Sequence, residues 1–514
     1  MNVIHVDTND PIGTISPHLY GCLFSSCCYG MVEAASPIPN EGGFRTDLIE
    51  AMRRAHIGML QWPAGDQAEY YQWRDGIGPR AGRPLRKANK WFPGCDDMAF
   101  APEDNAMGTH EFLHVCERVG AEPYLGVSLC YGSVADFHHW VEYCNCPYDT
   151  DLTRERRSNG RAEPFRARYW YLNNQGGYLT TEEYAAQVRR YFGFMPFFNT
   201  NPVRVARVDR ADGTRRFFRD WRERGEYRWM DYVPAPWNNL NPGVDALCYI
   251  RYGKTGPSTR FDTEQWYRAI AYGLGFQEWI DDKREEFEES FNPRMGVGLN
   301  EWGCMHDTSY IEENLLSLRQ KDTVRDALAA ATTLNVFNGN CDFVRFACLS
   351  DMISGIHHAF EVDETAGGAL ITTPTGLVFE LYAPHQGGTG VRTRAEVPEA
   401  ARIASATTST VADEEATVPI PQLQASASVK AATLTVTVVN GDRDRDVESE
   451  LRVSGAEPGE VNAVLLTHED PAALNSAQDP QRVQLREVPA AVAAGRLAHR
   501  FPAHSVTRLT VALR

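Results

Sequence analysis

Two short stretches of the chain hold residues that could do chemistry at the end of a strand. In GLNEWG (298–303), an apolar run ends in Glu301 next to Trp302. In YLNNQGGY (171–178), an aromatic run ends in carboxamides, of which Gln175 is the last, and then two glycines break the strand. A carboxylate at a strand end beside an aromatic ring suits a glycosidase nucleophile near a sugar face. The second stretch has the same setting but contains no acid, base or nucleophile.

The elements that must position these residues alternate along the chain. Apolar, strand-like runs are separated by longer amphipathic segments, which predicts a parallel sheet. Six or more such units over some 350 residues predict a (β/α)8 barrel with long loops. The runs are HIGMLQW (56–62), EPYLGVSL (122–129), RYWYL (168–172), VDALCYI (244–250), RMGVGLNEW (294–302) and DFVRFACL (342–349).

The segment after YLNNQGGY predicts a helix. Thr180 and Glu183 have the spacing of a capping box, and Tyr184, Val188 and Tyr191 lie on one helical face. This segment and the preceding run form a strand–loop–helix unit whose loop holds Gln175.

The composition changes after about residue 385. Aromatic residues become rare, and short Val/Thr/Leu runs alternate with turn residues, which predicts a small antiparallel β-sandwich. Asn440-Gly441 is a typical hairpin turn. We therefore expect an α/β protein with a barrel at 17–385 and a β-sandwich at 386–514, which the strand within 1–16 joins.

Overall composition narrows the possible partners. The 514 residues are 43% hydrophobic and 23% charged, as in ordinary globular proteins, and the formal net charge is −17. That charge argues against nucleic acid and anionic membranes and leaves a small neutral or cationic ligand. No run approaches the roughly 20 apolar residues of a membrane span, and the N-terminus lacks the features of a secretory signal. Apolar cysteines suggest reduced thiols, so we expect a cytoplasmic protein.

Much of the chain resembles the intracellular α-L-arabinofuranosidases of glycoside hydrolase family 51. The matching motifs keep the family's order and spacing and extend through the barrel into the sandwich. They are GGFRTDLIEAMRR (42–54), YYQWRDGIGPRAGRPLR (70–86), EDNAMGTHEF (103–112), GAEPYLGVSL (120–129), HHWVEYCN (138–145), NGRAEPFRARYWYLNNQ (159–175), GLNEWG (298–303) and TPTGLVFELYAPHQGG (373–388).

The resemblance implies a retaining glycosidase with two catalytic carboxylates. One is the nucleophile at the end of the seventh barrel strand, and here it is Glu301. The other is the acid/base in a Gly-Asn-Glu triplet at the end of the fourth strand, where this chain has Asn173, Asn174 and Gln175. Asn174 is expected to bind the ligand near its reacting carbon. Gln175 has the shape of the acid but cannot donate its proton, and general acid–base assistance is worth about 10²–10⁴-fold.

Other family positions around the sugar are also changed. The resemblance places Ser25 where the family has a sugar-binding Glu, and Asp66 where it has an Asn, in a motif whose Arg is here Gln61. In LCYIRY it places Cys248 where the family has a His before a tyrosine, here Tyr249. Asp351 replaces a family Gln. With Trp302, these residues are the predicted substrate-binding shell.

Three hypotheses explain this pattern. In the first, the protein is a pseudo-glycosidase that binds carbohydrate or a partner protein. In the second, which the retained Glu301 favours, it is an enzyme of altered chemistry whose leaving group needs no proton, or whose reaction is transfer or cyclisation. Asp66 and Asp351 would then supply a proton differently or bind an amine. In the third, Gln175 was introduced to trap a complex, which leaves the other changes unexplained.

No cofactor or metal is expected. Cysteine and histidine pairs such as Cys144-x-Cys146 lack the paired spacing of a structural zinc site. Cys248 as a thiolate nucleophile would need a depressed pKa. The expected ligand is a carbohydrate or a sugar-containing metabolite, and the family resemblance implies a homo-oligomer.

Overall fold

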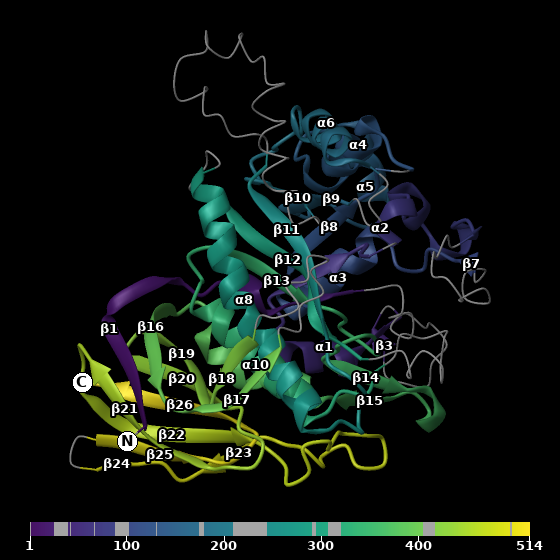
Figure 1. The fold of residues 1–514 in the computed structure, drawn as a ribbon. Helices are drawn as coiled ribbons and strands as arrows, with labels where there is room; N and C mark the ends of the chain where they lie inside the picture. The colour runs from purple at the N-terminus through teal and green to yellow at the C-terminus, as the bar shows by residue number, and fades with distance from the viewer. Residues whose placement is uncertain are drawn as a thin grey trace.

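The computed structural model describes residues 2–24, 40–41, 43–65, 67–87, 102–129, 131–173, 179–208, 244–289, 295–306, 320–404, 417–493 and 496–514. In this part of the chain, eight parallel strands close into a barrel and ten further strands form a second sheet (Figure 1). The predicted fold class, a barrel with a C-terminal β-domain, is confirmed. The barrel strands are β2 (Gly21–Leu23), β5 (Met59–Trp62), β8 (Glu122–Val127), β9 (Tyr169–Leu172), β10 (Val203–Arg207), β11 (Ala246–Lys254), β12 (Gly296–Met305) and β13 (Val344–Leu349).

Strands that follow each other along the chain are neighbours in the barrel, and β13 pairs with β2 to close it. Because all eight are parallel, their C-terminal ends meet at one mouth, where the side chains after each strand converge. Helices cover the outside of the barrel, as the strand–helix alternation predicts. They are α1 (Thr46–Arg54), α2 (Gln67–Tyr70), α3 (Thr109–Val119), α4 (Val134–Asn145), α5 (Asp151–Ser158), α6 (Thr181–Phe192), α8 (Thr263–Glu289), α10 (Val324–Asn338) and α11 (Pro374–Tyr382).

The predicted capping box begins α6. The backbone N–H of Glu183 donates to the Thr180 hydroxyl at 3.2 Å, and the Thr180 N–H donates to the Glu183 carboxylate at 2.9 Å. Tyr184, Val188 and Tyr191 are buried, so this face of α6 packs on the barrel. In the chain, this packed helix follows β9 after a short connection.

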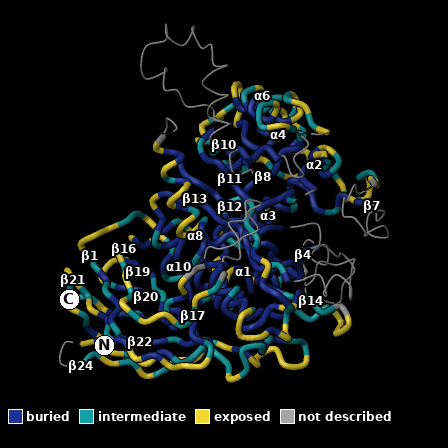
Figure 2. The backbone as a smooth tube through the Cα atoms, viewed as in Figure 1, coloured by how far each residue is buried: buried dark blue, intermediate teal, exposed yellow. Residues whose placement is uncertain are grey.

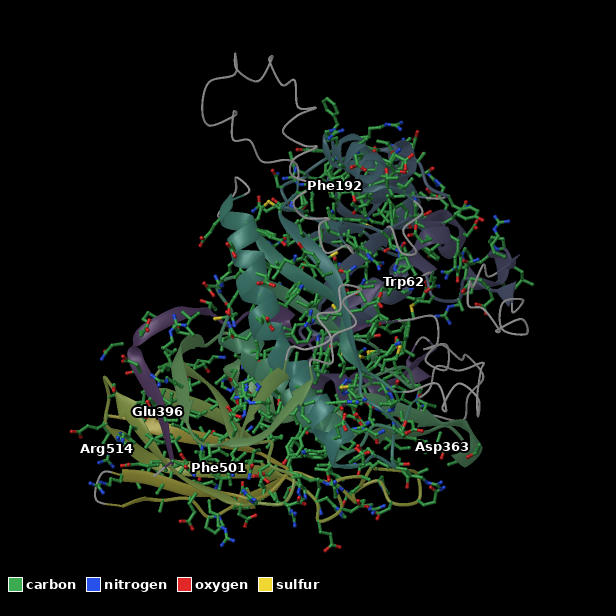
Figure 3. The ribbon with its side chains drawn as sticks, viewed as in Figure 1. Trp62, Phe192, Asp363, Glu396, Phe501 and Arg514 are labelled. Atoms are coloured by element: carbon green, nitrogen blue, oxygen red, sulfur yellow. The ribbon has the colours of Figure 1, made fainter. Side chains whose placement is uncertain are left out.

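The second sheet has a core of its own and takes up the N-terminal strand. β1 lies between β16 and β21, and inward residues from both halves of the sheet, including the fully buried Phe501, form one cluster (Figure 3). The strands are β1 (Asn2–Thr14), β16 (Thr389–Glu396), β19 (Leu423–Lys430), β20 (Thr433–Asn440), β21 (Val447–Ser454), β22 (Pro458–Leu466), β23 (Arg486–Val488), β24 (Val492–Ala493), β25 (Arg496–Phe501) and β26 (Ser505–Leu513). Four two-stranded sheets complete the described strands: β3 (Asn40–Glu41) with β4 (Phe44–Arg45), β6 (Arg86–Lys87) with β7 (Pro102–Glu103), β14 (Phe360–Asp363) with β15 (Ala369–Thr372), and β17 (Glu399–Ala404) with β18 (Thr417–Pro421).

The expected hairpin at Asn440-Gly441 does not form. β20 pairs with β19 and β26, whereas β21 pairs with β1 and β25. The Asn440 amide instead donates to the carbonyls of Arg445, Phe501 and Pro502, which holds the connection to β21 open.

Helix α10 lies between the barrel and the second sheet and is buried along its length (Figure 2), and α8 packs beside it and against β17 and β18. Polar contacts join them to the sheet: Ser426 and Thr437 donate to Asn335 of α10 at 2.7 Å each, and Trp266 of α8 donates to the Gly441 carbonyl at 3.1 Å. Among the described residues, no helix has the length and apolar character to cross a membrane.

Candidate active site at the mouth of the barrel

The interior of the barrel below its mouth is filled with side chains. Alternate residues of the strands point inward and form one packed cluster, which is the floor of any pocket at the mouth. Its members are Met59, Ala68, Tyr124, Tyr169, Tyr171, Val205, Ala246, Cys248, Phe346 and Cys348.

Glu301 faces the barrel interior because β12 contains a bulge. Along β11, Leu299 is opposite Tyr249 and Glu301 is opposite Ile250, so Asn300 has no residue of its own across from it. Side chains of a strand normally alternate between two faces, and an extra residue re-aims the side chains after it. Asn300 accepts a hydrogen bond from the interior Tyr124 at 2.6 Å, and the adjacent Glu301 is 5% exposed. The bulge thus brings a buried carboxylate to the mouth.

Tyr252 of β11 holds the Glu301 carboxylate. Its hydroxyl donates to Glu301 Oε2 at 2.6 Å and lies 2.7 Å from Oγ of Ser350, which directly follows β13. Burial, and then the carboxylates of Glu301 and Asp351, raise the pKa of Tyr252 well above its ordinary value. Tyr252 is therefore protonated near neutral pH and can donate a hydrogen bond to the Glu301 carboxylate. Asp351 is 5% exposed and accepts a hydrogen bond from the Ile356 N–H at 3.0 Å.

Another part of the mouth is built by the ends of β9 and β10, three and two strands away from β12. Arg207 Nη1 donates to Asn173 Oδ1 at 2.9 Å, and the Asn173 amide donates to the Gly65 carbonyl at 3.0 Å. Both side chains are buried. A guanidinium therefore lies against the residue that precedes Asn174 and Gln175 in the sequence.

Two predicted binding residues of β11 do not line the mouth. Cys248 is fully buried in the packed barrel floor, below Tyr252 on the same face of the strand. Tyr249 points to the outside, where its ring lies 5.1 Å from the ring of Trp279 on α8 and 5.5 Å from Lys283 Nζ. The tyrosine that contacts Glu301 is Tyr252. The prediction that Cys248 and Tyr249 line the pocket is therefore wrong.

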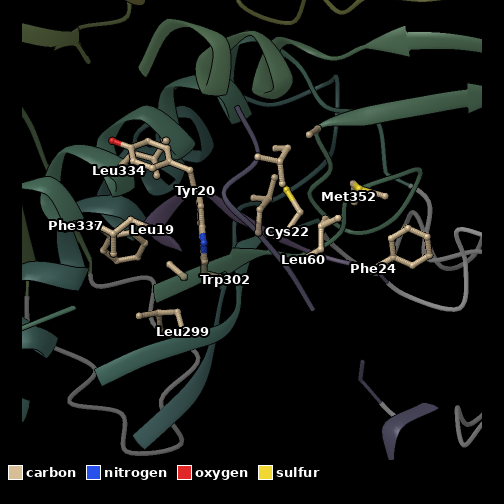
Figure 4. Packing of buried hydrophobic residues seen from close by; sticks show 14 of the residues in the cluster. Leu19, Tyr20, Cys22, Phe24, Leu60, Leu299, Trp302, Leu334, Phe337 and Met352 are labelled. Atoms are coloured by element: carbon tan, nitrogen blue, oxygen red, sulfur yellow. The ribbon is translucent and has the colours of Figure 1, made fainter. Parts of the chain in front are cut away.

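Trp302 also lies outside the barrel wall. It is fully buried, with its ring 5.7 Å from Phe337 of α10 and 6.2 Å from His357, and it packs near Leu19 and Tyr20 (Figure 4). An aromatic residue next to Glu301 in sequence points the other way because alternation resumes after the bulge. The expectation that Trp302 lines the sugar face is therefore wrong.

Four other predicted site residues, Ser25, Asp66, Asn174 and Gln175, lie outside the described residues. The structure adds Tyr252, Ser350 and Arg207, which sequence reasoning missed. Each is a polar residue at or directly after the C-terminal end of an apolar barrel strand, which is the signal that identified Glu301.

Two buried carboxamides near the mouth have polar atoms without hydrogen-bond partners. They are both amide atoms of Gln61 on β5 and Nδ2 of Asn300. Buried polar groups in native proteins normally have partners, and a ligand hydroxyl is one way to supply them. Within the described ranges, no group of three or more His, Cys, Asp and Glu side chains is arranged to hold a metal ion.

Comparisons with known proteins give a consistent family. The model "Alpha-L-arabinofuranosidase 1 domain" matches residues 51–202, and "Alpha-L-arabinofuranosidase C-terminal domain" matches 300–505. An intracellular exo-alpha-L-arabinofuranosidase from Bacteroides ovatus is 30% identical over 409 residues, which cover 75% of this chain and 73% of the relative. The GH51 arabinofuranosidase of Xanthomonas axonopodis pv. citri superposes with a TM-score of 0.84 at 25% identity, over 99% of this chain and 100% of the other. The thermostable GH51 enzyme of Thermotoga petrophila RKU-1 gives 0.81 at 25% identity, over 99% and 100%. The chain belongs to the GH51 family of α-L-arabinofuranosidases and is an arabinofuranosidase-like glycoside hydrolase.

Proposed function

We propose that this protein is a retaining-type glycosidase of altered chemistry that acts on a furanosyl donor with Glu301 as its nucleophile. The observation that carries this proposal is the buried Glu301 carboxylate at the barrel mouth, with Tyr252 donating to it at 2.6 Å. A carboxylate oriented by a hydrogen bond at this end of a barrel matches the covalent mechanism of retaining glycosidases. Relatives named as arabinofuranosidases make an arabinofuranosyl unit the first donor to test.

The reaction differs from ordinary hydrolysis because Gln175 stands where the family's acid/base is expected. A carboxamide neither protonates a departing alkoxide nor deprotonates water. Ordinary arabinosides are therefore hydrolysed weakly, and the favoured reactions are cleavage of an activated glycoside, transfer to another acceptor, or cyclisation. The substrate is a carbohydrate or a sugar-containing metabolite. The protein is also expected to form a homo-oligomer.

A pseudo-glycosidase is the second candidate. The absence of an acid at position 175 and the altered residues Ser25, Asp66 and Asp351 favour it. Against it stands the intact hydrogen bonding of Glu301 to Tyr252, since a protein that only binds carbohydrate has no need of a buried, oriented carboxylate.

Incubation with activated aryl or fluoro furanosides, followed by intact mass measurement, separates these candidates. We expect a covalent adduct of one furanosyl unit that is absent in Glu301→Gln. If the protein binds sugar but no activated donor gives an adduct or turnover, the pseudo-glycosidase is the remaining candidate. Gln175→Glu is a second test: the appearance of ordinary arabinofuranosidase activity would mean that the pocket still recognises arabinose despite its altered residues.

A further inference from the structure

Arg207 brings a positive charge into the mouth of the barrel. It is the last residue of β10, on which Val205 faces the packed interior and Ala206 faces the outer core. Alternation therefore directs the Arg207 side chain inward, and only 6% of this residue is exposed. A buried guanidinium needs polar partners, and one at this end of a barrel lies where ligand groups bind.

The surroundings of Arg207 fix its direction. Its backbone N–H donates to the Tyr184 hydroxyl at 2.7 Å, and the same hydroxyl donates to the Leu172 carbonyl at 2.7 Å. Its Nη1 donates to Asn173 Oδ1 at 2.9 Å. Tyr184 therefore ties the ends of β9 and β10 together, and the guanidinium is held against the last described residue before the expected acid/base position.

Arg207 and Glu301 act on the same chamber from different sides. Burial raises the pKa of Tyr171 in the barrel floor; the Glu301 carboxylate adds to that rise, and Arg207 opposes it. Arg207 belongs to the fifth strand and is hydrogen-bonded to the end of the fourth, whereas Glu301 belongs to the seventh. Around the barrel, β10 lies two strands from β12 and β9 lies three, so a donor that meets Glu301 and directs its leaving group toward the end of β9 places that group beside Arg207.

A fixed cation at this place changes the chemistry of leaving-group departure. Beside a general acid, a guanidinium would lower the pKa of the carboxyl group and make it a poor proton donor at neutral pH. A carboxamide, which the sequence has at position 175, carries no such proton, so its function is not impaired by a nearby guanidinium. A pre-positioned cation instead stabilises the negative charge that develops on the departing oxygen, without transferring a proton.

We propose that Arg207 contacts the leaving group, and that the natural donors are furanosides whose oxygen leaving group departs as a stable, unprotonated anion. This inference rests on the proposed function of Glu301. In the first step, Glu301 attacks the anomeric carbon, the bond from that carbon to the leaving oxygen breaks, and the electron pair stays on that oxygen beside Arg207. In the second step, water or another acceptor attacks the glycosyl ester, Glu301 leaves as the carboxylate, and the acceptor's proton goes to solvent.

The test uses a series of aryl α-L-arabinofuranosides whose phenols differ in acidity, from 2,4-dinitrophenol to phenol. For Arg207→Gln we expect kcat/KM for the more basic phenols to fall by about 10²–10³-fold, the usual effect of removing one charge-stabilising donor. The loss should be smaller for 2,4-dinitrophenol, so log(kcat/KM) falls more steeply with phenol pKa than in the wild type. Arg207→Lys, which keeps the charge, should recover part of the loss.

Arg204→Gln is the matched control. Arg204 lies on the same strand but pairs with Asp245 on the outside, with Nε 2.9 Å from Oδ2, so its loss should leave the slope unchanged. An equal loss for every phenol in Arg207→Gln, or no loss in a folded variant, would overturn the leaving-group role while the Glu301 adduct still forms. Absence of that adduct in the wild type would instead overturn the proposed function, and this inference with it.

Discussion

Tyr252 keeps a proton beside Glu301 at neutral pH, whereas Gln175 stands where the family motif has its acid. The pKa of Tyr252 is raised by burial, by Glu301 and by Asp351, so its hydroxyl keeps its proton well beyond neutral pH. Hydrogen bonds to charged groups contribute about 1.5–3 kcal/mol, so this contact helps to orient the Glu301 carboxylate. The carboxamide of Gln175 has no proton to lose. Asp351 is buried close to Tyr252, so a second acidic side chain lies on the same side of the mouth as Glu301.

The Tyr252 and Gln175 side chains predict that kcat/KM does not decline in alkaline solution. For an activated aryl furanoside we expect kcat/KM to stay level between pH 7 and 9, because Tyr252 remains protonated and Gln175 does not titrate. In Gln175→Glu the new carboxyl group assists an unactivated aryl arabinoside only while it is protonated, so that added activity should appear in acidic solution and be lost as the pH rises through a pKa that Arg207 lowers. Steady-state kinetics on both proteins from pH 4 to 9 give the comparison. An alkaline limb in the wild type that Gln175→Glu leaves unchanged would contradict this assignment.

Residues of strand β12 contact both the interior of the barrel and the core outside it. Before its bulge, Leu299 packs in the outer core, and after it Trp302 packs on Phe337 of α10 (Figure 4). Between them, Asn300 contacts Tyr124 inside the barrel and Glu301 contacts Tyr252 at the mouth. The tryptophan therefore packs the strand against a helix, next to the bulge that directs Glu301 inward.

Substitution of Trp302 tests this role directly. Trp302→Ala should lower the free energy of unfolding by about 3–5 kcal/mol, since it empties a fully buried site. Trp302→Phe should lose less, and its KM for an activated donor should equal that of the wild type because the indole does not touch the ligand. Urea unfolding and steady-state kinetics measure the two effects. A large rise in KM in a Trp302→Phe protein of unchanged stability would place the indole in the pocket after all.

At the scale of the whole molecule, buried polar groups join the barrel, α8, α10 and the second sheet. Several imidazoles are enclosed in this assembly, and burial is the main cause that lowers their pKa: to about 4 for His357, and to about 3 for His358 and His385. His358 is fully buried, and its Nδ1 lies 3.7 Å from Oδ2 of Asp322. Burial outweighs this carboxylate and favours the neutral imidazole in the folded state.

Stability should consequently decline in mildly acidic solution. The folded-state pKa of His358, about 3, is below the unfolded value of 6.5, so the unfolded chain binds more protons between these values. The contribution of His358 is complete above pH 6.5 and is lost as the pH falls toward 3. Lowering the pH from 7 to 5.5 should remove about 1 kcal/mol through this residue, and His358→Leu should abolish that part. Urea unfolding at both pH values is the measurement, and an equal pH effect in wild type and variant would refute it.

Local patterns in the sequence determined the elements and the chemical identity of the main candidate. The apolar runs at 56–62, 122–129 and 168–172 became β5, β8 and β9, and Thr180 capped α6 as its spacing predicts. These features depend on neighbouring residues, so a local pattern suffices for them. Glu301 as the carboxylate at a strand end was equally visible, and the family motifs identified Gln175 as the missing acid.

The tertiary structure alone decided which side chains meet. Counting alternate residues fails across the bulge at Asn300, so sequence could not show that Glu301 faces inward while Trp302 faces α10. Cys248 and Tyr249 were assigned to the pocket by matching a short family motif within LCYIRY, and a strand buried on both faces has no polar alternation that could have shown the correct register. The pairing of β10 with β9 joins segments that are distant in sequence, and it alone brings Arg207 to Asn173 at the end of β9.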